Sequence, residues 1–85
     1  MPYIKNEDRP RFRTILELFA NEDMSIGEMN YLITRMLMIY LNKDDVRYKK
    51  LNEIVGLIEC VKQEFYRRVV VPYEAKKIEE NGDVY

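Results

Sequence analysis

The sequence predicts an all-α protein with three main helices, at about residues 10–20, 26–41 and 46–70, and a short C-terminal helix or tail. Three observations carry this prediction. Apolar residues recur at the 3.6-residue period, helix-capping residues precede two of the periodic segments, and a proline follows the longest of them. The chain has 85 residues, which is the length of one domain, residues 1–85.

The first two helices are predicted from their starting signals. Pro10 suits the first turn of a helix, where its missing N–H would have no partner. Apolar residues then follow at the helical period until the polar residues 21–23, namely Phe12, Ile15, Leu16 and Phe19. The second helix is predicted to begin after Ser25, because Ser25 and Glu28 have the spacing of a capping box.

The second helix is apolar almost all round. One face carries Met29, Ile33, Leu37 and Tyr40, and the others carry Tyr31, Leu32, Met38 and Ile39. Such a helix is usually buried on more than one side, and two short neighbours in so small a chain cannot cover it completely. We therefore expect it to be sandwiched in a helical bundle, with its uncovered side forming an interface.

The third helix has the clearest periodic signal. Its apolar stripe comprises Leu51, Ile54, Val55, Ile58, Val61, Phe65 and Val69. Asp44 and Asp45 are the candidates for its N-cap. Pro72 disfavours the α conformation at Val71 and lacks an N–H, so the helix is predicted to stop or kink there, with Gly82 after a short fourth helix.

The size of the chain predicts an oligomer. A chain of 85 residues buries only about 60–65% of the surface that its unfolded form exposes, so a second copy would add to a marginal core. The residues expected at the interface between identical chains are Tyr31, Met38, Gly56, Cys60 and Tyr85. Gly56 suits either a close helix crossing or a tolerated place on a solvated face, and Tyr31 is either a contact or a surface tyrosine.

Composition excludes several classes of function. Fourteen Lys and Arg against fifteen Asp and Glu give a net charge of −1, which provides no global field for duplex DNA. There is no histidine and one cysteine, so zinc sites, His-based acid/base pairs and Cys–His dyads are not expected. The carboxylates Glu53, Glu59 and Glu64 lack the one-turn spacing of a Mg²⁺ site, although a Mg²⁺-dependent nucleotide hydrolase is the remaining enzymatic alternative. We expect no enzyme activity, metal or cofactor.

The same features predict a cytoplasmic protein, in the host cell if the gene belongs to a phage. No apolar run approaches the ~18 residues of a membrane span, and the N-terminal residues lack the apolar region of a signal peptide. The single cysteine, Cys60, cannot form an internal disulfide. We therefore expect no membrane contact and a reducing compartment.

Candidate ligand-binding residues gather near the end of the third helix. Lys62 lies about 40° from Ile58 on the helical wheel, inside the apolar stripe. Either its methylenes lie along apolar surface while its ammonium pairs with Glu59, or Glu59, Lys62 and Tyr66 line a polar pocket for an anionic ligand. Both interpretations stay open.

Two arginines and two tyrosines extend this group of candidates: Tyr66, Arg67, Arg68 and Tyr73. Arginine forks hold phosphates and aromatic faces stack bases, which would suit a nucleotide-like ligand with Asn30 reaching in from the second helix. Alternatively, the arginines offset the negative end of the helix dipole.

Three motifs carry a resemblance to a known family. They are MPYI at residues 1–4, GEMNYLIT at 27–34 and LIECVKQEFYRRVVVPYEAKKIEENGDVY at 57–85. With them, the chain resembles, over nearly its whole length, a family of short uncharacterised proteins of phages, prophages and bacterial genomes. The resemblance implies a phage or mobile-element setting and brings no catalytic residues with it.

Two functional classes remain open for this chain. The first is a non-enzymatic, oligomeric binding protein of phage type that holds a small anionic, nucleotide-like ligand, for instance to sequester a signal of host defence. The second is a protein–protein interaction, inhibitor or structural module that contacts a host protein and holds no small ligand. The charges and tyrosines near Arg67 suit both classes.

Overall fold

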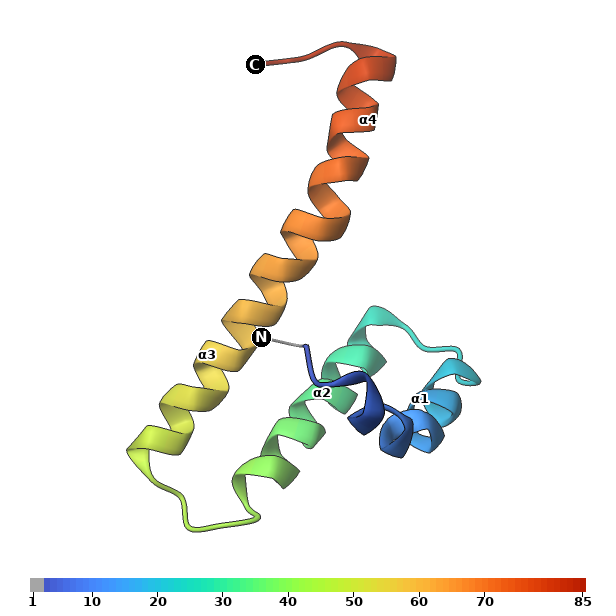
Figure 1. The fold of residues 1–85 in the computed structure, drawn as a ribbon. Helices are drawn as coiled ribbons and strands as arrows, with labels where there is room; N and C mark the ends of the chain where they lie inside the picture. The colour runs from blue at the N-terminus through green and yellow to red at the C-terminus, as the bar shows by residue number, and fades with distance from the viewer. Residues whose placement is uncertain (1–2) are drawn as a thin grey trace.

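The computed structural model describes residues 3–85 and consists of helices joined by short connections (Figure 1). The elements in chain order are the 3₁₀ turns η1 (Asn6–Asp8) and η2 (Pro10–Phe12), α1 (Arg13–Ala20), α2 (Ile26–Leu41), α3 (Tyr48–Phe65), the π turn η3 (Tyr66–Val70) and α4 (Val71–Asn81). No strand occurs in residues 3–85. The all-α prediction with three main helical segments is confirmed, because α3, η3 and α4 follow one another without a break.

The capping box predicted at the start of α2 is present. Ser25 Oγ accepts a hydrogen bond from the Glu28 N–H at 3.1 Å, and Glu28 Oε1 accepts one from the Ser25 N–H at 3.0 Å. These hydrogen bonds favour the carboxylate, and the bond from the Ser25 backbone is the main cause that lowers the pKa of Glu28. The start of α2 is therefore fixed by its own sequence.

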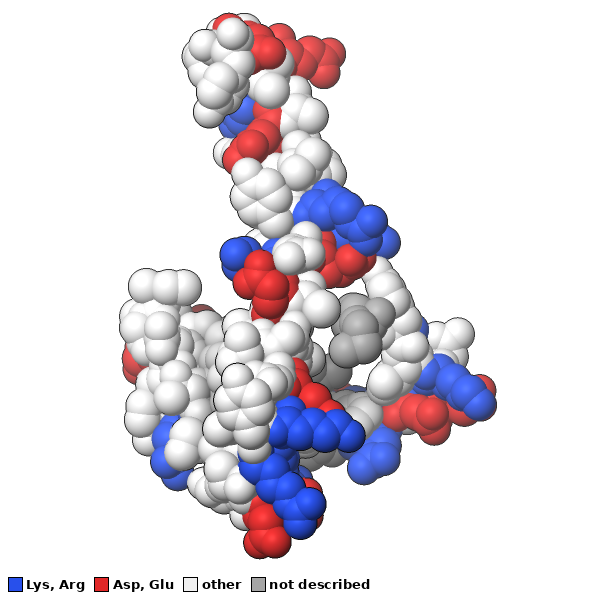
Figure 2. Space-filling view, turned by 90° about the vertical axis from the view of Figure 1, so that its left-hand side faces the viewer, with Lys and Arg blue, Asp and Glu red and all other residues white. Residues whose placement is uncertain are grey.

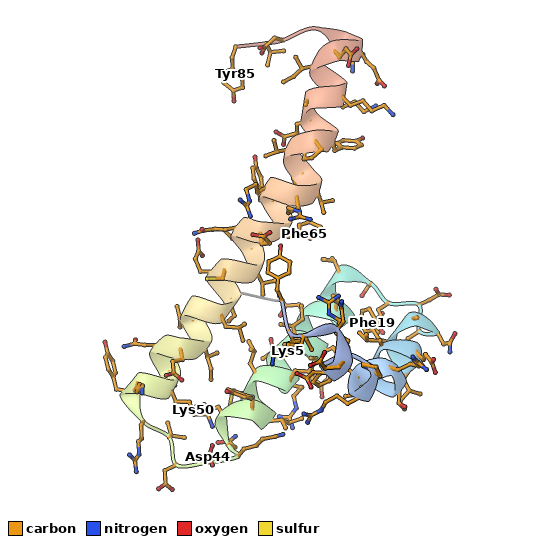
Figure 3. The ribbon with its side chains drawn as sticks, in the orientation of Figure 1. Lys5, Phe19, Asp44, Lys50, Phe65 and Tyr85 are labelled. Carbon is orange, nitrogen blue, oxygen red and sulfur yellow. The ribbon has the colours of Figure 1, made fainter. Side chains whose placement is uncertain are left out.

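The start of α3 differs from the prediction. Its N-cap residue is Arg47, which makes no side-chain capping bond, and Asp44 and Asp45 lie in the preceding turn. Asp44 instead accepts a hydrogen bond from Lys50 Nζ at 3.3 Å (Figure 3). The predicted capping role of the two aspartates is wrong, because Asp44 pairs with Lys50 across the turn rather than with the first N–H groups of α3.

The long helix also passes Pro72, where it was predicted to stop or kink. Val71 has α-helical angles (φ −59°, ψ −49°), and its N–H donates to the Tyr66 carbonyl, five residues earlier, as in a π-helix. In a regular α-helix the ring of Pro72 would clash with the carbonyl of Arg68, four residues before it. The wider π turn gives the ring room, so helix continues to Asn81.

The fold is extended and loosely packed, unlike the bundle that the sequence predicted. Its radius of gyration is 17.0 Å, against about 12 Å for a compact chain of this length. Its accessible surface is 8283 Å², against about 5,400 Å² for a compact protein of 10.3 kDa. Within residues 3–85 the one buried apolar side chain is Ile54.

The predicted sandwiching of α2 is therefore wrong for the single chain. Four of its side chains are half-buried, Met29, Leu32, Leu37 and Leu41, and none is buried. α2 packs against the first part of α3, and the long helix continues far beyond this contact (Figure 1). α2 is too short to cover the whole long helix, and α3 covers only one side of the apolar circumference of α2.

None of the helices in residues 3–85 combines the length and the apolar character that crossing a bilayer requires.

Candidate functional site

The candidate site lies on the second half of the long helix. From Ile54 onward, the residues nearest the middle of the long helix's apolar face become more exposed: 9% at Ile54, 44% at Ile58, 54% at Val61 and 59% at Phe65. Val55, toward the side of this face, is already 66% exposed. The middle of the face stays more than half exposed at Val69 and Tyr73. We call residues 61–81 the projecting helix, because most of their apolar side chains are exposed and only Val70 among them is half-buried.

The π turn keeps this stripe in line. Phe65, Val69 and Tyr73 are four residues apart, and in a regular α-helix each such step would turn the side chain by about 40°. The π turn takes up about one extra residue and so offsets that drift. As a result, an apolar face defined by Val61, Phe65, Val69 and Tyr73 runs along the projecting helix; we call it the apolar stripe of this helix.

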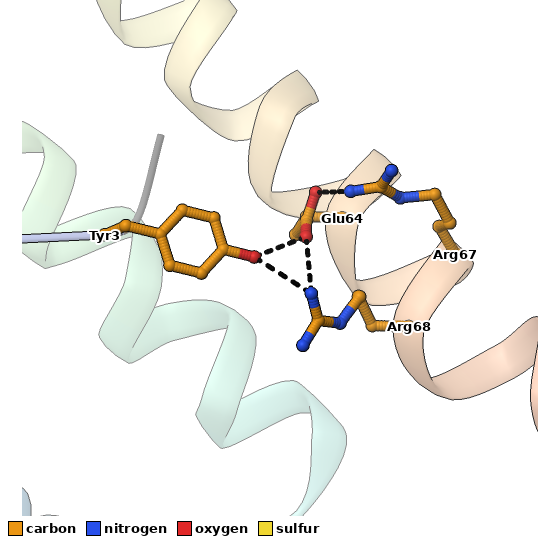
Figure 4. A network of polar contacts seen from close by, with 4 residues as sticks. All are labelled: Tyr3, Glu64, Arg67 and Arg68. Carbon is orange, nitrogen blue, oxygen red and sulfur yellow. Dashed lines mark hydrogen bonds and ion pairs between the residues drawn. The ribbon is translucent and has the colours of Figure 1, made fainter.

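A polar cluster lies beside this stripe and includes the N-terminal Tyr3 (Figure 4). The Tyr3 hydroxyl donates to Glu64 Oε1 at 2.6 Å. Arg67 Nη2 lies 2.6 Å from Glu64 Oε2, and Arg68 Nη1 lies 3.7 Å from Oε1 and donates to the Tyr3 hydroxyl at 3.3 Å. We call these four residues the Tyr3 cluster.

The electrostatics of the Tyr3 cluster favour an ionised Glu64. The hydrogen bond from Tyr3, followed by that from Arg67, lowers the pKa of the Glu64 carboxyl, and the same bond to Glu64 raises the pKa of the Tyr3 hydroxyl. The Glu64 side chain is 25% exposed, whereas those of Arg67 and Arg68 are 70% and 64% exposed. One carboxylate thus orients two guanidinium groups whose remaining donors face solvent.

The other predicted ligand residues occupy separate places. Glu59 pairs with Lys62 at 3.2 Å and accepts a hydrogen bond from Gln63 at 3.1 Å, and these contacts, Gln63 first, lower the pKa of Glu59. The Lys62 side chain is 70% exposed, so its ammonium lies in solvent. Asn30 lies on α2, where its backbone carbonyl accepts a hydrogen bond from the Thr34 hydroxyl at 2.8 Å.

Tyr66 and Tyr73 project from the same helix as the two arginines. Their side chains are 52% and 62% exposed. The structure therefore brings Tyr66, Arg67, Arg68 and Tyr73 onto one stretch of the projecting helix and its π turn, and leaves Asn30 on another helix. A ligand that used all of them would have to span two elements of the fold.

The residues predicted for the oligomer interface are all on the surface of the single chain. Tyr31 and Met38 on α2 are 68% and 42% exposed, and Cys60 and Tyr85 are exposed. A side chain added at Gly56 would meet nothing within 4 Å. That open space agrees with both interpretations of Gly56, a close crossing or a solvated face.

Tyr3 and Glu64 were missed as site residues. They are 61 positions apart, and no local pattern in the sequence predicts that they touch. One signal was available: the family-like motifs MPYI and LIECVKQEFYRRVVVPYE contain one of them each.

A second polar feature that the sequence did not predict lies at the turn between α2 and α3 (Figure 3). The Lys50 ammonium stands 4.9 Å from the centre of the Tyr40 ring and beside Asp44, and its side chain is only 14% exposed. An open cavity of about 580 Å³ adjoins these residues, with its lining completed by Asp45, Arg47, Lys49 and Glu53. Its lining has as many acidic as basic side chains, so the cavity has no net charge with which to select a charged ligand. We assign these contacts to closing the turn.

No group of three His, Cys, Asp or Glu in residues 3–85 could hold a metal ion.

Comparison with known proteins places the chain in one family. No curated protein and no solved structure matches it. The family described as "Domain of unknown function (DUF6899)" matches residues 1–84, a range that includes the Tyr3 cluster and the whole projecting helix. Because this match covers the chain almost from end to end, the chain belongs to that family.

Proposed function

We propose that this chain is a non-enzymatic binding protein whose projecting helix binds a protein partner through its apolar stripe. The observation that carries the proposal is the exposure of this stripe, with Val61, Phe65, Val69 and Tyr73 all more than half exposed on one face. Burying the remaining half of such side chains would contribute about 1 kcal/mol each. A partner of matching shape would therefore gain several kcal/mol on this face.

The position of the stripe supports the same proposal. It begins where the cover by α2 ends and continues without a charged residue among its four members. A helix laid along it would use the pattern of apolar anchors one turn apart by which helices bind helices. A phage or mobile-element origin, as the motifs suggest, would make a host protein or a phage protein the natural partner.

A small anionic, nucleotide-like ligand is a second candidate, favoured by the Tyr3 cluster. Arg67 and Arg68 present free guanidinium donors from one fixed carboxylate, and Tyr66 and Tyr73 offer aromatic faces nearby. Glu64 opposes this function, because its ionised carboxylate already holds both arginines and would repel a phosphate. The protein-binding function therefore comes first, and nucleotide sequestration second.

One experiment separates these functions. The protein is purified from the cells that make it, its native mass is measured, and the small molecules released by denaturation are identified by mass spectrometry. An assembly that releases no small molecule supports protein binding. A stoichiometric nucleotide, lost in Arg67→Ala and Arg68→Ala while the native mass is kept, supports the second candidate. A bare monomer without ligand contradicts both.

A further inference from the structure

We infer that the partner of the apolar stripe is a second copy of this chain, with the two projecting helices packed antiparallel. This inference rests on the proposed function and names its partner. Three observations on the described residues support it: the area left open, the distribution of charge along the projecting helix, and the symmetry that the stripe allows.

The open area is large enough for the interface of a permanent dimer. The accessible surface of 8283 Å² exceeds that of a compact chain of the same mass by about 2,900 Å². Permanent homodimers bury about 2,000–5,000 Å² in total, and the excess of two chains, about 5,800 Å², is larger than this. The excess is shared with α1 and α2, where Leu18 and Tyr31 are 66% and 68% exposed, so an interface along the projecting helix covers one part of it. A partner that touched only one or two side chains would leave most of this surface in water.

Charge along the projecting helix and the four residues that follow it favours its own reversed copy. Residues 61–70 contain three basic side chains, Lys62, Arg67 and Arg68, against the single acidic Glu64. Residues 71–85 contain four acidic side chains, Glu74, Glu79, Glu80 and Asp83, against Lys76 and Lys77. The first segment thus carries a net charge of +2 and the second a net charge of −2.

The two segments differ on the surface, although each also contains side chains of the opposite charge (Figure 2). Basic side chains gather partway along the projecting helix with acidic side chains beside them, and acidic side chains predominate toward its far end. In an antiparallel pair, each basic segment lies beside the acidic segment of the other chain. In a parallel pair, like charges lie side by side, which costs stability.

Two-fold symmetry repeats this pairing of basic and acidic segments at both ends of the interface. Two identical chains pair most often about a two-fold axis, so a contact made by one copy is repeated by the other. An axis near Val69 sets Phe65 of each chain opposite Tyr73 of the other, and the π turn, which lies at the axis, keeps both side chains on one face. The stripe is therefore complementary to its own reverse.

Cys60 provides a direct test of both the partner and the direction. It is the one cysteine of the chain, it is exposed, and it lies outside the apolar stripe. In an antiparallel dimer centred near Val69, two spin labels on Cys60 would be separated by about eighteen residues of helix, nearly 30 Å. In a parallel dimer they would lie about 10 Å apart, one helix diameter.

The experiment combines native mass with electron–electron distance measurement on the labelled, full-length chain. A dimer with labels about 30 Å apart is the expected result. A dimer with labels about 10 Å apart overturns the antiparallel arrangement. A monomer that binds a different protein overturns the homodimer and leaves the proposed protein-binding function intact. A folded monomer that binds nothing overturns both the homodimer and the proposed function.

A matched pair of substitutions assigns the interface. Val69→Asp lies in the stripe, and Val55→Asp lies on the same long helix outside the projecting part, with exposures of 51% and 66%. Val69→Asp should weaken dimerisation on the order of 100-fold, and Val55→Asp should leave it within a few-fold. Equal effects would overturn the assignment. If Val69→Asp fails to fold, the double variant Glu79→Lys with Glu80→Lys replaces it. Its dimer affinity should be about tenfold lower, and lower still in low salt, where the repulsion between like charges is less screened.

Discussion

The two halves of the long helix share one apolar period and differ in what covers it. In residues 48–60, α2 reduces the exposure of Ile54 to 9%, whereas in the projecting helix Phe65 and Tyr73 are 59% and 62% exposed. Both halves repeat apolar residues at the spacing of a core-facing helix. The period thus determines which face is apolar, and the length of the neighbouring helix determines how much of that face is buried.

The polar contacts of the two halves differ in the same way. Lys50 in the covered half has a side chain that is 14% exposed and is shared between Asp44 and the ring of Tyr40. Arg67 in the projecting half is 70% exposed, although its ion pair with Glu64 is shorter. The charged contact of the covered half closes a turn, and that of the projecting half leaves donors available to another molecule.

The largest expected effect belongs to the covered half. Ile54→Ala should lower the free energy of unfolding by about 2–4 kcal/mol, because it removes buried methyl groups and leaves a cavity. Ile26→Ala is the matched control, since Ile26 is 87% exposed, and its effect should stay below about 0.5 kcal/mol. Urea unfolding of both variants measures the difference. Equal losses would show that α2 and α3 do not form the core of the chain.

Pro72→Ala should separate stability from association in the projecting half. Alanine restores an N–H and removes the ring that the π turn accommodates, so the helix should gain about 1–3 kcal/mol. A return to regular α-helix would also rotate Tyr73 and the residues after it by about 100° relative to Phe65. The midpoint temperature of thermal unfolding, measured at low protein concentration, should therefore rise. The affinity of the dimer, measured by sedimentation equilibrium, should fall. A gain in both would mean that the π turn plays no part in aligning the stripe.

The cap at the start of α2 and the cap at the end of α4 test how strongly each of these two helices is coupled to the rest of the fold. Ser25→Ala removes a hydrogen bond of the capping box and should cost about 1 kcal/mol of global stability. Gly82→Ala is strained, because Gly82 has φ +88°, but it lies at the tip of the projecting helix. Its effect should be confined to faster amide exchange in the last turn of α4, with unchanged urea unfolding. A global loss from Gly82→Ala would show that the tip is packed in solution.

The smallest expected effect concerns pH and the Tyr3 cluster. Because folding lowers the pKa of Glu64, its contribution is fully present above the pKa of an unfolded glutamate and is lost as the pH falls through the lowered value. Tyr3→Phe removes the main cause of this shift, so the Glu64 pKa should rise toward its ordinary value. Carboxyl NMR titration checks this directly, with Tyr73→Phe as the control. An unchanged titration in Tyr3→Phe would exclude the Tyr3–Glu64 contact.

Local signals predicted the elements of the fold well. The capping box at Ser25 and Glu28, the start near Pro10 and the stripe through Ile54 all act over a few residues, and the structure contains all three. The passage through Pro72 was not predicted, because the wider turn that admits the ring leaves no mark in the apolar period. Helix propensities and apolar periods describe a regular α-helix, so they do not predict a local π turn.

The candidate site was predicted in part. Arg67 and Arg68 stood out by their charge near an apolar stripe, but their common partner Glu64 and the distant Tyr3 did not. A contact between residues 61 positions apart depends on where the fold places Tyr3 relative to the long helix. The packing of α2 was overestimated for a related reason: the apolar pattern gives no information on whether a neighbour belongs to the same chain.

The large accessible surface has a calorimetric consequence. The heat-capacity change of unfolding grows with the apolar area that becomes hydrated, and a compact chain of 85 residues would show about 1.0–1.3 kcal/mol/K. A single chain with 8283 Å² already in water should fall well below that range and have a flat stability curve. A value within the range would mean that the chain keeps its apolar stripe dry until it melts.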